Sequence, residues 1–168
     1  IYTLSLHDAL PIWSAWLMGS LAGASWSQLA GLAPVTLLGA LLLCAFGRDL
    51  NIMAMGDRAA ASLGVATKKL RLGLVALCSL LTALAVSVSG VIGFVGLIVP
   101  HLLRQLLGPD NRLLLPASFL AGALLLLLAD TLTRAVLPSE VPIGVLTALL
   151  GGPFFCFLFK KRQRHGGL

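Results

Sequence analysis

The sequence predicts an all-α protein that crosses a membrane several times. Hydrophobic residues make up 58% of the chain and charged residues only 11%, and the mean hydropathy is +1.00. A soluble domain of 168 residues with this composition would have too little polar surface to cover its core. Eleven of the twelve Lys and Arg residues also lie in three short clusters separated by long apolar runs, as in chains threaded repeatedly through a bilayer.

The first twelve residues differ in composition from the rest of the chain. Residues 1–12 (IYTLSLHDALPI) look like translated sequencing-adapter read-through, and they lack the basic region and small-residue cleavage site of a signal peptide. We therefore expect 1–12 to be a non-native segment. The fold is predicted from residues 13–168, where the natural sequence begins abruptly near Trp13.

Five apolar stretches are candidates for membrane-spanning helices, because about 20 helical residues cross a hydrocarbon core about 30 Å thick. The third stretch follows the second after Gly90 alone, which requires a very tight turn or a re-entrant segment, and Pro100 predicts a kink within it. Gly151, Gly152 and Pro153 interrupt the fifth and predict close backbone packing or a local break. The predicted spans are residues 28–47, 72–89, 91–107, 113–136 and 143–159.

The basic clusters predict the direction of each span. They occupy residues 48–71, 104–112 and 160–164, and the positive-inside rule places all three on the cytoplasmic side without omitting a span. The C-terminus is then cytoplasmic, and residues 13–27 lie outside. An odd number of spans after an abrupt start predicts the C-terminal half of a larger membrane domain.

The segment between the first two spans, residues 48–64, is too polar to cross a membrane and predicts two short cytoplasmic helices. Gly56 separates the two helices, and Gly64 ends the second. Asp57 either caps the second helix or stabilises its positive N-terminal end. Three alanines propagate this helix: Ala59, Ala60 and Ala61.

Two interpretations of this connector follow from its residues. Its small side chains would let the backbone of another protein approach closely. Adaptable apolar contacts to that partner would come from Ile52, Met53, Met55 and Leu63. The alternative is an amphipathic connector that lies on membrane lipid. Physical chemistry alone weighs the two equally.

Composition and motifs argue against several other classes. The net charge of +6 could suit nucleic acid, but the basic residues lie at the ends of apolar runs and lack interleaved stacking aromatics. The three cysteines lie in different apolar runs without C-x-x-C spacing, so neither a disulfide framework nor a metal site is predicted. The chain has no G-x-x-x-x-G-K-[ST] loop for nucleotide, and we expect it to perform no chemistry and to need no cofactor.

Two sets of motifs resemble a known family. The stretch from Ala59 to Gly64 (AAASLG) resembles the EAA…G coupling motif of ABC importer permeases, with Asp57 or Arg58 at the acidic position. More specific are SGVIGFVGLIVPHLLR at 89–104, GPDNR at 108–112, LPAS at 115–118, LAD at 128–130, Arg134, EVPIG at 140–144 and GGPF at 151–154. In this order and spacing they resemble the FecCD-type permeases, which import iron-siderophore complexes, cobalamin and haem. Members of that family have about twice as many spans, so the chain resembles their C-terminal half.

The resemblance implies a permease subunit of an ATP-driven importer in a bacterial cytoplasmic (inner) membrane. Its partners would be separate cytoplasmic ATP-binding subunits, an external substrate-binding protein and a second permease copy or paralogue. The ATP-binding subunits would dock on the connector. The residues expected to couple to them are Met53, Gly56, Asp57, Ala59, Ala60, Ala61, Leu63 and Gly64.

The same resemblance implies roles for residues elsewhere. Arg134 would dock the binding protein with help from Glu140, while an internal ion pair with Asp130, four residues earlier, is an alternative that does not exclude docking. Gly93 and Gly96 would leave a small-residue face on one helix for tight packing. Two further residues, Asp110 and Arg112, are expected to close a cytoplasmic turn or to lie in a solvated loop.

Two functions of other classes remain open. One is a secondary transporter driven by an ion gradient, for which discontinuous spans and the intramembrane Asp130 would be the relevant features. The other is a non-transporting subunit of a membrane assembly.

Overall fold

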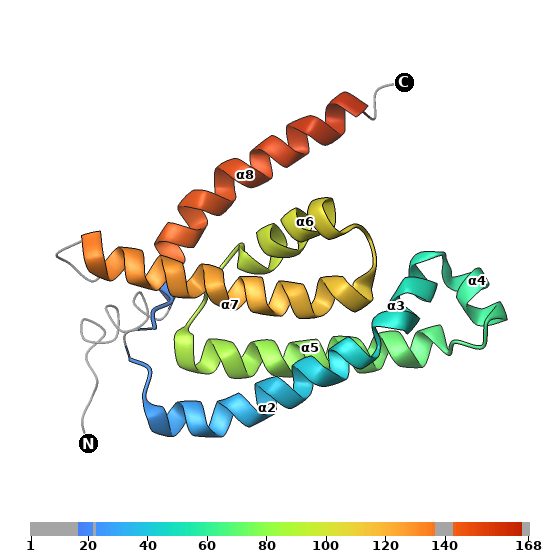
Figure 1. The fold of residues 1–168 in the computed structure, drawn as a ribbon, viewed down its shortest axis with the longest axis horizontal. Coiled ribbons are helices and arrows are strands. Elements are labelled where there is room, and N and C mark those ends of the chain that lie inside the picture. Colours follow the sequence, from blue (N-terminus) through green and yellow to red (C-terminus); the bar gives the residue numbers. More distant parts are fainter. Residues whose placement is uncertain (1–16, 22, 137–142, 166–168) are drawn as a thin grey trace, which may run out of the picture. The chain divides into compact units, whose positions relative to one another are not determined.

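A computed structural model describes residues 17–21, 23–136 and 143–165 of the chain, and these residues form helices joined by short turns (Figure 1). The predicted all-α fold is therefore confirmed for the described part. Its helices are α2 (Trp26–Ala45), α3 (Gly47–Ala54), α4 (Asp57–Ser62), α5 (Thr67–Ser89), α6 (Val95–Leu107), α7 (Asn111–Val136) and α8 (Ile143–His165).

Three helices, α2, α5 and α7, are long and apolar enough to cross a membrane. They match the first, second and fourth predicted spans. The third prediction was too long, because residues 90–94 are not helical and α6 has only 13 residues. At about 1.5 Å per residue such a helix is about 20 Å long, which is less than the hydrocarbon thickness. The fifth span corresponds to α8, whose apolar part is Ile143–Phe154.

The chain divides into two compact units, each of which is described on its own. One unit contains residues 24–88 and 99–121. The described residues up to 23, residues 89–98 and those from 122 onward form the other. The first unit holds α2 to α5, and the second holds α8.

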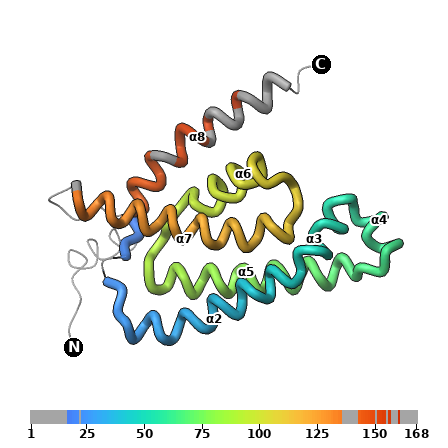
Figure 2. Tube along the Cα trace, viewed as in Figure 1, coloured from blue at the N-terminus to red at the C-terminus, as the bar shows by residue number. Residues whose placement is uncertain are grey.

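In the first unit, α2 begins at a capping box. The Ser25 hydroxyl accepts the Gln28 N–H at 3.3 Å, and the Gln28 side chain accepts the Ser25 N–H at 3.1 Å. Only Phe46 separates the end of α2 from α3, and the tube in Figure 2 follows α2 through α3 and α4 into α5. The middle of α2 meets α5 where Gly39 faces Leu81, and a Cβ at Gly39 would lie 2.5–3.0 Å from atoms of that leucine.

In the second unit, the start of α8 packs against the backbone at Met18 and at Val91. A side chain at Gly144 would overlap the Met18 carbonyl and would lie 3.1 Å from the Val91 carbonyl oxygen. The neighbouring Ile143 and Thr147 are each only 2% exposed. The tightest part of this unit is therefore the first turn of α8, and Gly144 makes that packing possible.

Phe94 has an unusual backbone in the same unit. Its φ is +65°, which is the left-handed region that bulky residues rarely adopt. Its ring lies against Gly151, where any side chain would overlap it. The close approach predicted for residues 151–153 thus occurs at Gly151, and α8 continues through Gly152 and Pro153 without a break.

The prediction that Gly93 and Gly96 share one helix was wrong. Gly93 lies before the start of α6, because the left-handed Phe94 prevents the helix from extending back to it. A Cβ at Gly93, Gly96 or Gly152 would have no neighbouring atom within 4 Å. Pro100 lies inside α6, as expected.

Replacing Gly39 by valine is expected to destabilise the α2–α5 contact by about 1–3 kcal/mol, because the added side chain would overlap Leu81. Thermal unfolding of the chain in detergent micelles, followed by circular dichroism, measures the effect. Gly31→Val is the matched control, since Gly31 lies in the same helix and has open space around it. Equal loss of stability in both variants would show that the α2–α5 contact is not responsible.

Candidate functional site

The connector between α2 and α5 forms two short helices, as predicted. Helix α3 ends at Ala54, Gly56 follows with φ +106°, and α4 runs from Asp57 to Ser62. Asp57 occupies the first turn of α4, and Gly56 takes the N-cap position without a side-chain hydrogen bond. Of the two roles considered for Asp57, the structure therefore favours stabilisation of the positive helix end over capping.

Gly64 ends α4 in a Schellman motif. Its φ is +83°, its N–H donates to the Ala61 carbonyl at 3.1 Å, and the Val65 N–H donates to the Ala60 carbonyl at 3.0 Å. These bonds satisfy two carbonyls that the helix end would otherwise leave unpaired. The predicted end of α4 at Gly64 is thereby confirmed and has a physical cause.

A surface ion pair ties α4 to α5. The Arg71 guanidinium donates to Asp57 Oδ1 at 2.8 Å, and both side chains are more than half exposed. An exposed pair of this kind contributes at most about 1 kcal/mol, so it orients α4 more than it stabilises the fold.

The expected coupling residues divide into two sets by exposure. Ala60 is fully buried, so its side chain forms part of the core beneath α4. Met53 and Ala59 are half-buried. Leu63 is 62% exposed, and Met55, which is not a member of the expected set, is 71% exposed. The remaining members of the expected set are exposed: Gly56, Asp57, Ala61 and Gly64.

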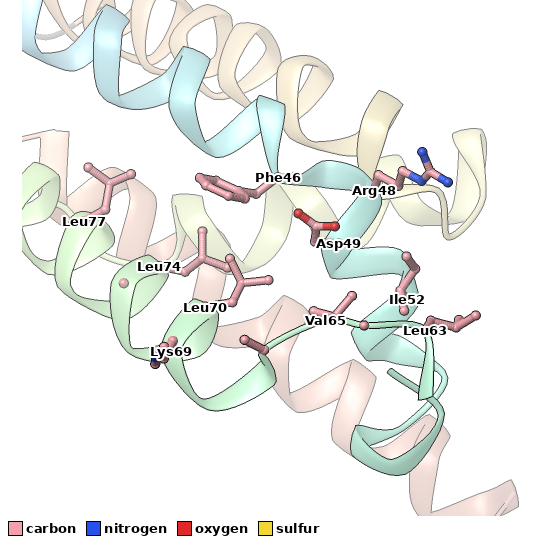
Figure 3. Close-up of a pocket in the computed structure, with 13 residues that line it drawn as sticks. Phe46, Arg48, Asp49, Ile52, Leu63, Val65, Lys69, Leu70, Leu74 and Leu77 are labelled. Atoms are coloured by element: carbon pink, nitrogen blue, oxygen red, sulfur yellow. The ribbon is translucent and has the colours of Figure 1, made fainter. Parts of the chain in front are cut away.

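A pocket of about 710 Å³ opens beside α3 and the start of α5 (Figure 3). Leucines from α5 line one part of it, and Asp49 projects from α3 near the Phe46 ring. Ile52 and Leu63 extend the lining toward α4. The connector therefore borders a depression of mixed apolar and charged character that could receive a side chain from another protein.

Sequence reasoning missed a junction between α3 and the start of α7. Asn51 Nδ2 donates to Asp110 Oδ1 at 2.6 Å, and the Asn111 N–H donates to Asn51 Oδ1 at 2.8 Å. Asp110 Oδ1 also accepts the Arg112 N–H at 2.9 Å, so Asp110 caps α7. We call these contacts the Asn51–Asp110 junction. Of the two expectations for Asp110 and Arg112, the turn is the one observed.

The junction favours the ionised form of Asp110. The Arg112 N–H, and after it the Asn51 amide, hold the pKa of this carboxyl below its ordinary value. A lowered pKa means that the carboxylate stabilises the fold fully above the ordinary value of about 4, and that this contribution is lost only as the pH falls through the lower folded value. The hydrogen bonds of the junction therefore favour the carboxylate form of Asp110 that accepts them.

Arg134, in the last turn of α7, forms the internal ion pair that was considered as an alternative. Its Nε donates to Asp130 Oδ2 at 2.9 Å. The Arg134 side chain is still 58% exposed, whereas that of Asp130 is 22% exposed. The bond engages Nε, so the two terminal amino groups of the guanidinium can still meet another acceptor. Glu140 lies outside the described residues.

No cluster of three or more His, Cys, Asp or Glu residues that could hold a metal ion occurs in the part of the chain that the structure describes. The described residues form a connector of two short helices, which is joined to α2 and α5 along the chain and to α7 by the Asn51–Asp110 junction.

The arrangement defines a class: a polytopic α-helical membrane protein that carries a pair of short polar helices between two of its long apolar ones. The sequence model of the FecCD transport family matches residues 1–161, and the chain belongs to this family. That match includes residues 1–12, whose foreign origin stays a prediction.

Individual relatives agree with the family match. The hemin transport system permease protein HmuU of Yersinia pestis is 47% identical over 166 residues, which are 98% of this chain and 50% of the relative. The cobalamin import system permease protein BtuC of Halobacterium salinarum is 45% identical over 148 residues, or 88% of this chain and 40% of the relative.

A solved structure assigned to the metal-chelate type of ABC transporter, in an inward-facing conformation, matches with a TM-score of 0.86 at 39% identity. The match covers 93% of this chain and 51% of that one. The chain thus spans about half the length of the curated relatives it matches.

Replacing Gly64 by valine should weaken the end of α4 by about 1–2 kcal/mol, because a branched side chain is strained at φ +83°. Asparagine tolerates this conformation better, so Gly64→Asn should cost less. Space around Gly64 is open, and steric contact therefore does not complicate the comparison. Hydrogen exchange of the Gly64 and Val65 amides measures the effect, and equal protection in the two variants would contradict it.

Proposed function

We propose that the chain is part of the permease subunit of an ATP-driven importer. The observation that carries this proposal is the pair of short helices, α3 and α4, with the exposed Met55 and Leu63 at their C-terminal ends, in a member of the FecCD transport family. A short polar helix pair that is fixed to long apolar helices is suited to receive force from a partner. Separate cytoplasmic ATP-binding subunits would supply that force.

The proposed topology places α3, α4 and the C-terminus in the cytoplasm of a bacterial inner membrane. The basic residues support it, because those of the connector and of the C-terminal end fall on one side when α5, residues 90–107, α7 and α8 each cross once. Residues 90–94 would add to the short α6 in completing that crossing. Arg134 then lies at the external end of α7, where an external substrate-binding protein would approach. A second permease copy or paralogue would complete the translocation path.

The proposed cargo is a bulky metal chelate. Two relatives are named for hemin and cobalamin, and the matching structure is described as a metal-chelate type transporter. Haem and cobalamin both hold a metal within a large organic ring. We therefore infer a substrate of this class, with hydrolysis of ATP confined to the separate subunits.

Uptake by the intact transporter in proteoliposomes separates this proposal from its rivals. An importer of this type requires ATP inside or outside the vesicle, according to the orientation of its ATP-binding subunits. A secondary transporter would respond to an ion gradient without ATP. A non-transporting assembly subunit would support neither form of uptake.

Ala61→Trp should reduce co-purification of the ATP-binding subunits with the intact permease about tenfold, because the bulky ring would stand on the exposed face of α4. Ala60 is a poorer choice for this test, since its buried side chain would disturb the fold as well. Ala24→Trp is the matched control, because Ala24 is also exposed but lies in the proposed external segment. Unchanged co-purification of the Ala61 variant would contradict docking on α4.

Arg134→Glu should weaken binding of the loaded substrate-binding protein about tenfold at low salt and less at high salt, because exposed charges act through a screened field. Asp130→Asn removes the internal pair but keeps the Arg134 charge, and it should leave this affinity intact or raise it. Binding can be measured by surface plasmon resonance on permease in nanodiscs. An unchanged affinity in the Arg134 variant would leave this residue with the internal ion pair alone.

A further inference from the structure

The Asn51–Asp110 junction engages both polar ends of one amide side chain. Asn51 donates through Nδ2 to Asp110 and accepts through Oδ1 from the next residue, Asn111. Asp110 is fixed in turn by the Arg112 N–H. The Asn51 side chain therefore cannot rotate without breaking two hydrogen bonds, and one of these, to a carboxylate, belongs to the stronger kind.

A backbone contact reinforces the junction one turn earlier in α3. A Cβ at Gly47 would lie 3.1 Å from the Arg112 Cα and 3.3 Å from its nitrogen. Gly47 and Asn51 are four residues apart and so lie on the same face of α3. Two successive turns of α3, at Gly47 and at Asn51, therefore contact the start of α7.

We propose that the Asn51–Asp110 junction transmits displacement of the α3–α4 segment to α7, with Asn51 and Asp110 as positioning residues. The inference rests on the proposed function, in which ATP-binding subunits move that segment. Helix α7 continues from Asn111 to Val136 and carries Arg134 in its last turn. One helix thus bears both the junction and the proposed contact with the binding protein.

A second attachment changes how α3 can move. Along the chain, α3 is joined to α2 through Phe46 alone, and a single residue between two helices can act as a pivot. The junction holds α3 at a second point on α7. A push on α3 and α4 therefore shifts the end of α2 and the start of α7 together. With the attachment at Phe46 alone, α3 could rotate about that residue without moving α7.

The test exchanges the two side chains in the intact transporter, with its ATP-binding subunits and binding protein in proteoliposomes. Asn51→Asp alone sets two carboxylates against each other and removes the donor to Asp110. The double variant Asn51→Asp with Asp110→Asn restores the hydrogen bond between the two side chains with donor and acceptor reversed, and the carboxylate at position 51 can still accept the Asn111 N–H. One oxygen of Asp110 accepts both the Asn51 amide and the Arg112 N–H, so the exchange restores the link between α3 and α7 at the expense of the bond from Arg112. The measured quantity is substrate taken up per ATP hydrolysed.

We expect Asn51→Asp to lower this ratio at least about fivefold, while co-purification of the ATP-binding subunits stays within about twofold of wild type. The exchanged pair should return the ratio to within about twofold. Thr36→Ala is the control for loss of a side-chain hydrogen bond, since Thr36 bonds only to carbonyls of its own helix α2. A normal ratio in Asn51→Asp, or no recovery in the exchanged pair, would overturn the inference.

If the Asn51→Asp transporter does not assemble, a further variant tests the same inference. Asp110→Ser keeps a hydroxyl oxygen that can cap α7, but its shorter side chain does not reach Asn51. It should lower the same ratio, and a normal ratio in an assembled Asp110→Ser transporter would again overturn the inference. Failure of the proposed function can be distinguished from failure of this inference. If the proposed function were wrong, the wild-type permease would not bind the ATP-binding subunits at all.

Discussion

The backbone of this chain is governed by the hydrocarbon environment, which offers no hydrogen-bonding partner to an unpaired peptide group. Helix α5 shows the effect most clearly. None of its residues, all of which are described, is buried within the chain, yet it is helical from Thr67 to Ser89. Its regularity therefore does not depend on packing against other parts of this chain. The connector and the junction lie between the long helices, where the described chain also departs from helical geometry at Gly56, Gly64 and Gly108. Arg134 and Asp130, by contrast, lie within the long helix α7.

The small helix α4 depends on this arrangement. A helix of six residues has no stability of its own in water, because too few hydrogen bonds offset the cost of starting it. It is held by the Gly64 motif at one end, by the ion pair of Asp57 with Arg71 and by the buried Ala60 side chain beneath it. The buried Ala60 thus fixes which face of α4 is exposed, although a docking partner could not reach its side chain. Within the AAASLG stretch, the buried and exposed alanines have different roles.

Sequence patterns predicted the features that depend only on residues close together in the chain. The apolar runs predicted α2, α5 and α7, and Gly56 and Gly64 predicted the limits of α4. Contacts between distant residues could not be found this way. Asn51 and Asp110 are 59 residues apart, and each is an ordinary polar residue in its own segment. The start of α6 was misplaced for a similar reason. A phenylalanine gives no local indication of a positive φ, and the gap that accommodates its ring is provided by Gly151. Only the assembled structure reveals either pairing.

The conformation of Phe94 also has a consequence for how the protein is made. A left-handed phenylalanine is costly by itself and persists where its surroundings determine it. Those surroundings include Gly151, which follows Phe94 by 57 residues in the sequence and is therefore synthesised later. The Phe94 ring reaches its final packing only after Gly151 has been added and α8 has placed this glycine against the ring. In this part of the protein, the order of insertion differs from the order in which the structure becomes fixed.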